Sequence, residues 1–156
     1  MKKYWQEYKV ILFLFVGWKF ILGYIERISP FIWQLKEGYL GNSHWANFDG
    51  QHYISIALNG YYNFQQAFFP LYPLTIRYLA KLMPSDPELI GLIISNVAFF
   101  FGLCIFYELY RKIYHNESVW PVIFLLVFPT SFFFSTVYSG SLYFLLANGT
   151  IYYLTK

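Results

Sequence analysis

The sequence predicts an all-α membrane protein, and three observations lead to this class. Of the 156 residues, 58% are hydrophobic and only 12% are charged, whereas charged residues supply about a quarter of a typical soluble domain. Apolar stretches recur along the chain, with lengths close to the roughly 20 residues that a helix needs to cross a bilayer. Clusters of Lys and Arg flank these stretches. We therefore expect a single membrane domain with about four transmembrane helices and a large first extracytoplasmic loop that contains amphipathic interfacial helices.

Four segments are the predicted transmembrane helices: residues 10–28, 89–109, 119–134 and 141–155. The first follows a basic start but has no small-residue cleavage pattern, so we expect a retained anchor rather than a removed signal peptide. The last two belong to one charge-free run, 118–155. As a single helix this run would be about 57 Å long, about twice what a bilayer needs. We therefore predict a break at PTSFFFSTVYSGS, residues 129–141, where proline, glycine and hydroxyl residues interrupt the apolar sequence.

The basic clusters predict the topology, because cytoplasmic flanks carry the excess of Lys and Arg. One cluster lies before the first helix, one after the second and one after the fourth: Lys2, Lys3 and Lys9; Arg111 and Lys112; Lys156. Because an even number of crossings separates any two of these clusters, all three lie on the same side of the membrane. The N-terminus is then cytoplasmic. Loop 29–88, with three basic and four acidic residues, is then extracytoplasmic. In a bacterium it would face outward from the plasma membrane, and in a eukaryote we expect it in the lumen of the endoplasmic reticulum.

This loop of about 60 residues contains two patterns of helical period. In DGQHYISIA, the residues Tyr53, Ile56 and Ala57 share one side and Asp49 and His52 another. After Pro70 and Pro73, which we expect to fix a turn, LTIRYLAKLM sets Leu74, Tyr78, Leu79 and Leu82 against Arg77 and Lys81. Both patterns predict amphipathic helices at the membrane interface.

Composition also excludes several classes of function. The net charge of +3 is small and its basic residues are scattered, so we expect no nucleic-acid partner. The single cysteine, Cys104, allows no internal disulfide and no thiolate metal cluster. The chain has no Walker loop and no GxGxxG, GxSxG or HExxH motif, so we expect no cofactor and none of the common soluble chemistries.

Asp49 is the main candidate for chemistry, and its position allows two interpretations. It directly precedes a predicted helix, where a carboxylate stabilises the helix by accepting backbone N–H bonds. A carboxylate held near a membrane surface among aromatic residues can also act as a general base for a hydroxyl nucleophile. Spacing alone favours the cap and leaves both interpretations open.

The neighbouring residues carry weaker signals. His44, Asp49 and His52 resemble a metal-ligand set, but they lack a strict i, i+4 pair and hydrogen bonding in a loop is the more ordinary role, so we expect no metal. Trp45 and Tyr53 belong to a group of aromatic residues that would suit a sugar or lipid, although such residues also gather at membrane interfaces. Arg77 and Lys81, four residues apart, would attract a lipid phosphate or simply extend to the interface.

Two stretches resemble the PIG-V family of GPI mannosyltransferases and its bacterial relatives. WANFDGQHYISIALNGYY followed by QAFFPLYPLTIRYLAKL is similar to the first luminal loop of that family, where an aspartate and a His-Tyr or His-Phe pair precede an IA..GY turn and FFPLYP. FPTSFFFSTVYSGSLYFLL is similar to a later segment, FP.S.F.S..Y.ESLF. Gly140 stands where that segment commonly has glutamate, which puts in doubt any role of the acidic position here.

The resemblance implies a GT-C fold and a glycosyltransferase that takes a hexose from a polyprenyl-phosphate donor and passes it to a lipid, glycan or protein acceptor. By the same resemblance, Asp49 is the residue that activates the acceptor hydroxyl. From their positions we expect Arg77, with Lys81 behind it, to stabilise the departing phosphate, and His52 to orient the carboxylate or bind phosphate. Trp45 and Tyr53 are the expected substrate contacts.

The length of the chain leaves alternatives open. GT-C proteins generally have eight or more membrane helices, so the sequence corresponds to an N-terminal portion of such a fold, and we expect a fragment or a protein with a missing C-terminal half or partner subunit. The alternative function is a non-catalytic membrane subunit or scaffold with a truncated or degenerate fold. A transporter or lipid-binding protein of other descent is a third hypothesis, which further helices with paired intramembrane charges would support.

Overall fold

A computed structural model describes residues 2–32 and 45–155 of the chain. The described residues form helices and connecting segments without β-strands, which confirms the all-α class. The elements in chain order are α1 (Lys2–Ile32), α2 (Asp49–Asn59), α3 (Leu71–Leu82), α4 (Pro87–Tyr114), α5 (Trp120–Val127), the 3-10 helix η1 (Ser131–Ser135) and α6 (Gly140–Leu154).

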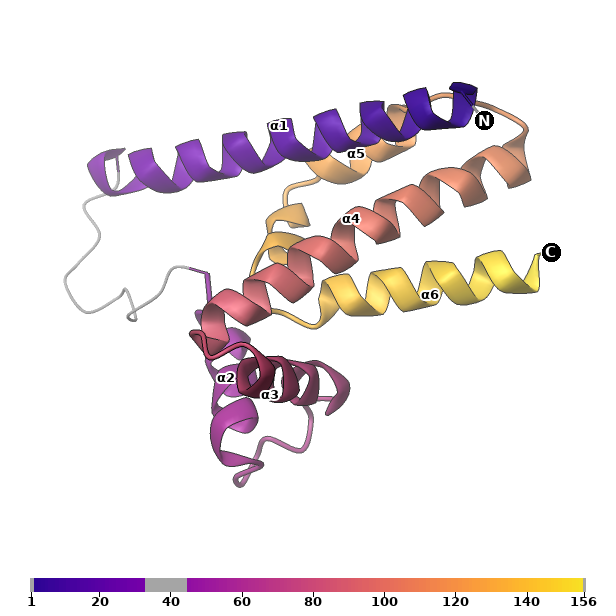
Figure 1. Ribbon diagram of the computed structural model, residues 1–156. Coiled ribbons are helices and arrows are strands. Elements are labelled where there is room, and N and C mark those ends of the chain that lie inside the picture. Colours follow the sequence, from indigo (N-terminus) through magenta and orange to yellow (C-terminus); the bar gives the residue numbers. More distant parts are fainter. Residues whose placement is uncertain (1, 33–44, 156) are drawn as a thin grey trace.

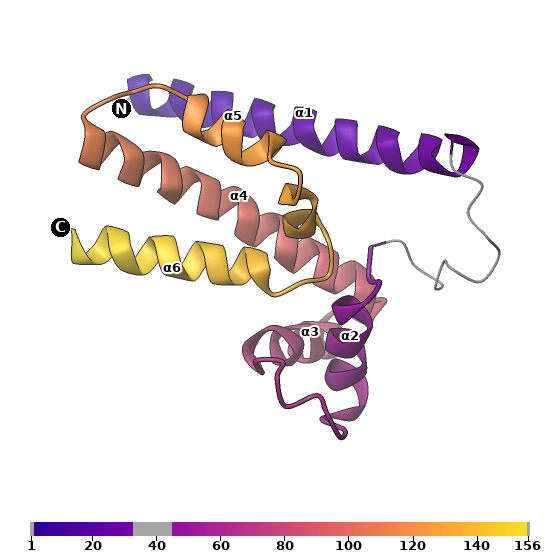
Figure 2. The ribbon, with the colours of Figure 1, turned by 180° about the vertical axis from the view of Figure 1, so that it is seen from behind.

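The long helices α1, α4 and α6 run lengthwise beside one another, and α5 lies against α1 (Figures 1 and 2). The pair α2 and α3 lies across the beginning of α4, at one end of this arrangement. The N-terminus, the end of α4 and the C-terminus lie together at the opposite end. The end of α4 carries Arg111 and Lys112, and Lys9 lies in the N-terminal part of α1. The membrane topology stays a prediction.

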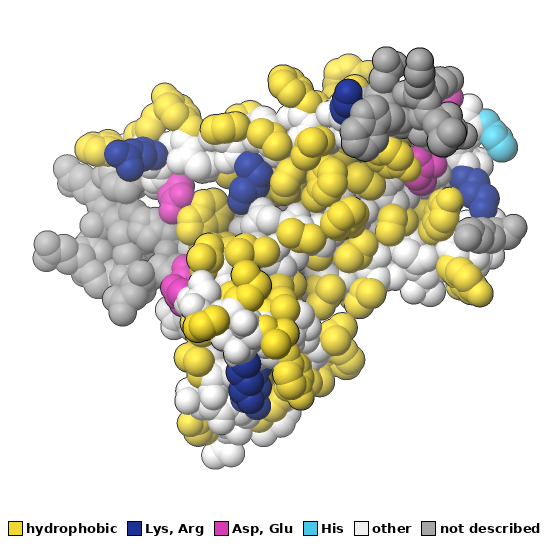
Figure 3. All heavy atoms as spheres, in the orientation of Figure 1, with side chains coloured by type: hydrophobic (Ala, Val, Ile, Leu, Met, Phe, Trp, Pro, Cys, Tyr) yellow, Lys and Arg dark blue, Asp and Glu magenta, His cyan; other side chains and the backbone are white. Residues whose placement is uncertain are grey.

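Within the described residues, two helical segments are long and apolar enough to cross a membrane, Glu7–Ser29 and Pro87–Tyr114. They agree with the membrane class that the composition predicts. The space-filling view shows apolar side chains over most of the long-helix face, with few and separated charged groups (Figure 3). The number of crossings, four in the sequence-based topology, stays a prediction.

The third predicted transmembrane segment, 119–134, is not one continuous helix. Helix α5 ends at Val127 and Phe128 is extended, with φ −62° and ψ 134°. The reason is local, because a residue before proline is pushed out of the α region and Pro129 follows Phe128. The chain then makes a single 3-10 segment before α6 begins at Gly140. The stretch between α5 and α6 overlaps the break predicted at 129–141, and α5 ends before residue 134, the predicted end of the third transmembrane segment. The spans themselves stay predictions.

Two buried clusters hold these elements together. The first joins α1, α4 and α5 and contains Ile11, Trp18, Phe99, Leu103, Tyr107, Val122 and Leu126. Within it Phe99 stacks on Phe134 of η1, with 4.6 Å between ring centroids. The second cluster joins α2 and α3 to the start of α4 and contains Ala46, Tyr53, Ala57, Tyr72, Ile76, Ile90 and Val137. The segment between η1 and α6 therefore supplies part of the core under α2.

The two loop helices bury different kinds of face. In α2 the buried side chains are Tyr53, Ile56 and Ala57, as the helical period predicts. In α3 the buried residues are Tyr72, Pro73 and Ile76. Of the predicted apolar stripe, Leu79 is partly buried against the second cluster, while Leu74, Tyr78 and Leu82 stay exposed. An exposed apolar stripe is what a helix at a membrane interface presents to lipid, and that location stays a prediction.

Candidate functional site

Two segments far apart in the sequence meet at the beginning of α4. One is residues 45–53 and the other is residues 135–139, which we call the connecting strap. The Val137 N–H donates to the Trp45 carbonyl at 2.8 Å. The Tyr138 hydroxyl donates to the Asn47 carbonyl at 3.2 Å. The Tyr53 hydroxyl and Ser139 Oγ share a hydrogen bond of 2.6 Å. The two stretches that carry the family resemblance thus form one structural unit.

Helix α4 supports this unit with a row of polar side chains. Ser95 Oγ donates to the Tyr138 carbonyl at 3.2 Å and shares a 2.7 Å hydrogen bond with the buried Tyr72 hydroxyl. On the next residue, Asn96 Oδ1 accepts from Ser135 Oγ at 3.3 Å. Because a buried polar group without a partner costs free energy, these bonds fix the strap in one position relative to α2 and α4.

Asp49 is the first residue of α2 and its side chain is exposed. The capping interpretation does not hold for its carboxylate, since the first amides of the helix are satisfied by backbone. Gly50 N–H donates to the Asn47 carbonyl at 3.0 Å and Gln51 N–H to the Phe48 carbonyl at 3.1 Å. The residue at the cap position is Phe48, which makes no side-chain capping bond. The Asp49 carboxylate is therefore presented to the surface.

The backbone before Asp49 is strained. Phe48 has φ 52° and ψ −119°, a region that bulky residues rarely occupy. Such strain costs of order 1–3 kcal/mol and gathers at functional sites. Its effect here is to turn the chain sharply into α2, so that Asp49 leads the helix.

The Asp49 charge affects the pKa values of two tyrosines, Tyr53 and Tyr138. Burial raises the pKa of Tyr53, the hydrogen bond with Ser139 opposes that rise, and the Asp49 carboxylate adds to it. Burial also raises the pKa of Tyr138, and the Asp49 carboxylate raises it further. Asp49 therefore interacts electrostatically with both Tyr53 and Tyr138, and burial together with its charge favours the neutral form of each hydroxyl.

Gly50 permits the close approach of α2 to the strap. A Cβ at this position would lie 3.2 Å from the Val137 carbonyl oxygen and 3.4 Å from the Ala46 Cβ. Both neighbours are tightly held, one as backbone and one in the buried cluster. The glycine after Asp49 therefore brings the helix start within reach of Val137.

His52 is oriented by the loop that follows α2. Its Nδ1 lies 3.3 Å from the Gln65 amide nitrogen, and its ring stacks on Phe68 with centroids 4.9 Å apart. Phe68 also makes an edge contact with Tyr53 at 5.1 Å. His52 and Tyr53 thus belong to one aromatic wall beside Asp49.

Trp45 connects the unit to α1. The ammonium of Lys19 lies 5.1 Å from the centroid of the Trp45 ring and donates a hydrogen bond to Ser135 Oγ. Trp45 also lines a cavity of about 590 Å³ between α1 and residues 126–136. The predicted substrate contact at Trp45 is therefore beside a space large enough for a ligand.

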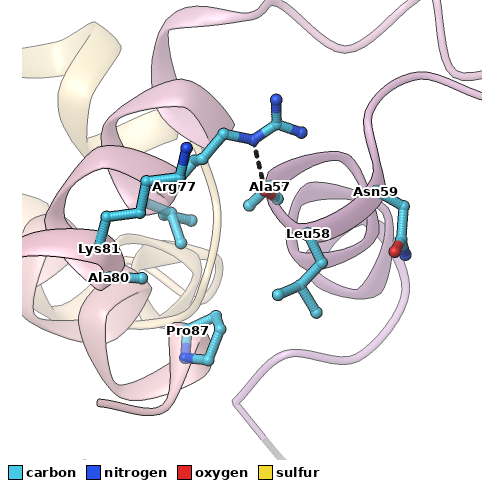
Figure 4. A pocket seen from close by; sticks show the side chains of 8 residues that line it. Ala57, Leu58, Asn59, Arg77, Ala80, Lys81 and Pro87 are labelled. Carbon is cyan, nitrogen blue, oxygen red and sulfur yellow. Dashed lines mark hydrogen bonds between the residues drawn. The ribbon is translucent and has the colours of Figure 1, made fainter. Parts of the chain in front are cut away.

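Arg77 and Lys81 lie at the other end of α2. The Arg77 side chain donates from Nε to the Ala57 carbonyl at 2.6 Å and from Nη2 to the Ile56 carbonyl at 2.7 Å, so it caps the C-terminal end of α2. Arg77 and Lys81 line a separate pocket of about 350 Å³ with Asn59 and Pro87 (Figure 4). Asp49 and Ala57 are eight residues apart, about 12 Å along the helix. Arg77 and Asp49 therefore lie at opposite ends of α2.

No group of three or more His, Cys, Asp or Glu side chains within residues 2–32 and 45–155 is arranged to hold a metal ion. One member of the His44, Asp49 and His52 set, His44, lies outside the described residues.

The sequence patterns did not single out the polar residues that hold the site together. Ser135, Tyr138 and Ser139 fall within a predicted break, and Ser95 and Asn96 within a predicted transmembrane helix. Polar residues inside an apolar span often pair across helices, and this signal was present at Ser95 and Asn96.

Gly140 begins α6 directly after the strap. A Cβ at Gly140 would meet only the Phe134 ring, at 3.8 and 3.9 Å, which is ordinary contact. The backbone therefore accepts a side chain where the resembling family commonly has glutamate.

Comparison with known proteins identifies the family of the chain. The family model described as Mannosyltransferase (PIG-V) matches residues 19–156. A relative named GPI mannosyltransferase 2, from Drosophila pseudoobscura pseudoobscura, is 31% identical over 134 residues, which cover 76% of this chain and 29% of the relative. The aligned part is thus less than a third of that relative's length. No solved structure matches the chain significantly. The matched region contains both the 45–53 segment and the strap, and the chain belongs to the PIG-V mannosyltransferase family.

Proposed function

We propose that the chain is the N-terminal catalytic portion of a membrane mannosyltransferase that takes its sugar from a polyprenyl-phosphate donor and passes it to a hydroxyl of a lipid, glycan or protein acceptor. The observation that carries this proposal is the convergence of the 45–53 segment and the strap around the exposed Asp49 carboxylate. Under the predicted topology this reaction takes place on the extracytoplasmic side.

In the proposed step Asp49 acts as the general base. One carboxylate oxygen accepts the proton of the acceptor hydroxyl while the acceptor oxygen forms a bond to the anomeric carbon. The bond from that carbon to the phosphate oxygen breaks, and its electron pair leaves with the polyprenyl phosphate. A single displacement of this kind inverts the anomeric configuration.

The surrounding residues have the chemistry for binding. The hydroxyls of Tyr53 and Tyr138 are neutral at physiological pH, and burial and the Asp49 charge raise the pKa of each further above its usual 10.0. Neutral hydroxyls donate and accept hydrogen bonds with sugars. His52 and Trp45 add aromatic faces of the kind on which sugar rings stack. We assign Arg77 and Lys81 to anion binding in their own pocket, since about 12 Å of helix separates that pocket from Asp49.

The donor class is tested by supplying labelled mannose in two forms to native membranes that contain the gene product. We expect transfer from polyprenyl-phosphate mannose and none from a nucleotide-linked mannose after the lipid donor is depleted. Membranes from cells that lack the gene are the control. Transfer that depends on the gene but uses only the nucleotide-linked sugar contradicts the proposed donor. Equal transfer with and without the gene contradicts the proposed function.

A further inference from the structure

Lys19 is a cation deep in an apolar helix. It lies 12 residues after Glu7 and 10 before Ser29 in the membrane-length segment Glu7–Ser29, which places it about 18 Å and 15 Å from the two ends. Burying an ionisable side chain at such a depth costs free energy, and such residues usually bind a ligand or pair with an opposite charge. The question is therefore which group balances Lys19.

The contacts of Lys19 within the described part of the chain are with neutral groups. Its ammonium donates to the Ser135 hydroxyl and faces the Trp45 ring at 5.1 Å. The carboxylates of Glu7 and Glu108 pair with Arg111. Glu26, seven residues and about two helical turns further along α1, interacts with the Lys19 charge at longer range. The direct contacts of the Lys19 ammonium are thus a hydroxyl and an aromatic face, with the Glu26 carboxylate acting from further away. An ammonium has three N–H donors, so it can also bind an anion.

The backbone beside Lys19 is irregular. Residues 128–139 lie between α5 and α6 with only one short 3-10 segment. Ser135 in this stretch bonds Asn96, which is nine residues into α4, about 14 Å from its start. At this depth in a membrane, irregular backbone persists only where protein buries it or where it lines a polar cavity.

A cavity of about 590 Å³ adjoins this backbone. Apolar side chains of α1 and of residues 126–132 make up most of its wall, and Trp45 and Thr136 line it on the side of the strap. Trp45 forms both a part of this wall and the ring that faces the Lys19 ammonium. Glu26 and Ser29 also line the cavity, nearer the C-terminal end of α1. The arrangement provides a mostly apolar space with the Lys19 ammonium beside it, next to Trp45, and the Glu26 carboxylate in its wall further along α1.

We propose that Lys19, together with Ser135 and Trp45, binds the phosphate of a membrane lipid whose hydrocarbon chain lies in this cavity. The inference rests on the proposed function, because a polyprenyl-phosphate-dependent transferase must hold a lipid phosphate inside the membrane. It adds the residue that recognises the phosphate. Both a polyprenyl phosphate and a glycerophospholipid such as phosphatidylinositol present this chemistry, and the experiment distinguishes these two sources.

The test is equilibrium binding to the purified chain in lipid nanodiscs. The ligands are a polyprenyl phosphate and the matching polyprenol, which lacks the phosphate, with phosphatidylinositol as competitor. Since hydrogen bonds to a charged group are about twice as strong as neutral ones, we expect the phosphate to raise affinity roughly tenfold or more. Lys19→Met should abolish this preference and Lys19→Arg should keep most of it. The matched control is Lys9→Met, on the same helix and ten residues away, which should keep the preference.

Competition by phosphatidylinositol that depends on Lys19 identifies a glycerophospholipid as the source. Its absence identifies polyprenyl phosphate. An undiminished phosphate preference in the Lys19→Met variant overturns the proposal. If that variant fails to fold, Lys19→Gln provides the same neutralisation with a polar side chain, and the same two outcomes apply to it.

The result is separable from the proposed function through Asp49→Asn, which should retain phosphate-dependent binding. Loss of transfer with retained binding supports both proposals. Binding that depends on Lys19 in a protein without any transfer activity contradicts the proposed function alone.

Discussion

Replacing Gly91 by alanine should push α4 against Val137 of the strap and lower the stability of the fold. Gly91 is buried in α4, and its carbonyl accepts a hydrogen bond from the Tyr72 hydroxyl at 3.0 Å. A Cβ at Gly91 would lie 2.8 Å from Val137 Cγ1, 3.3 Å from Ile76 Cδ1 and 3.4 Å from the Tyr72 hydroxyl oxygen. All three neighbours are fully buried, so none has free space into which it can move.

The magnitude follows from two opposing effects. To reach an ordinary 3.4 Å contact, Val137 must move by 3.4 − 2.8 = 0.6 Å, and overpacking of this kind costs about 1–3 kcal/mol. Alanine in place of glycine stabilises a helix by about 1 kcal/mol. The net loss of stability is about 0–2 kcal/mol. Val137 N–H holds the Trp45 carbonyl, so the displacement also reaches the segment that leads to Asp49.

The assay is equilibrium unfolding in detergent, with Gly149→Ala as the matched control. Gly149 lies in α6, and a Cβ added there would meet no atom within 4 Å, so this variant should gain up to about 1 kcal/mol from helix propensity alone. We expect the two variants to differ by about 1–3 kcal/mol. Equal stabilisation by both substitutions would refute the close contact between α4 and Val137.

Two further predictions concern α2. Burial raises the pKa of Tyr53 above 10.0, so its contribution to stability is complete below pH 10.0 and is lost as the pH rises through the higher folded pKa. Tyr53→Phe should therefore lose less stability than the wild type above pH 10.0 in unfolding measured across the alkaline range, and an identical pH dependence would contradict this. Arg77→Met removes both bonds to the α2 carbonyls and should cost about 1.5–3 kcal/mol in the same unfolding assay. Lys81→Met, at an exposed position of the last turn of α3, should leave stability unchanged, and equal losses in both variants would rule out the capping role.

The fold was predictable where apolar periodicity and length decide it. The buried side of α2, with Tyr53, Ile56 and Ala57, follows from spacing alone. The break after α5 follows from Pro129, although the length of the helix before it does not. In α3 the residues that fill the core are Tyr72 and Ile76, because packing against α4 selects one of two apolar faces, and a single sequence does not show which face a neighbour will cover.

The candidate site was predictable only in part. Asp49 stands out by its position and by family resemblance, but its freedom from capping depends on the Asn47 and Phe48 carbonyls, which sequence does not place. The structure places Arg77 and Asp49 at opposite ends of α2, which the sequence does not show, and the role of Arg77 at the departing phosphate stays a prediction. The contacts of Ser139 with Tyr53 and of Ser135 with Lys19 join elements more than 80 residues apart, and local patterns carry no information on such pairs.

The most direct test of the central claim compares two aspartates of the same loop. Asp49→Asn removes the proposed base, and Asp86→Asn is the control, since the Asp86 carboxylate caps α4 by accepting from the Glu88 N–H at 3.0 Å. Mannose transfer from the lipid donor is measured in native membranes at matched protein levels. General base catalysis contributes about 10²–10⁴-fold, so we predict a loss of about 100-fold or more for Asp49→Asn and near wild-type transfer for Asp86→Asn. Undiminished transfer by Asp49→Asn would contradict the assignment of Asp49 as the base.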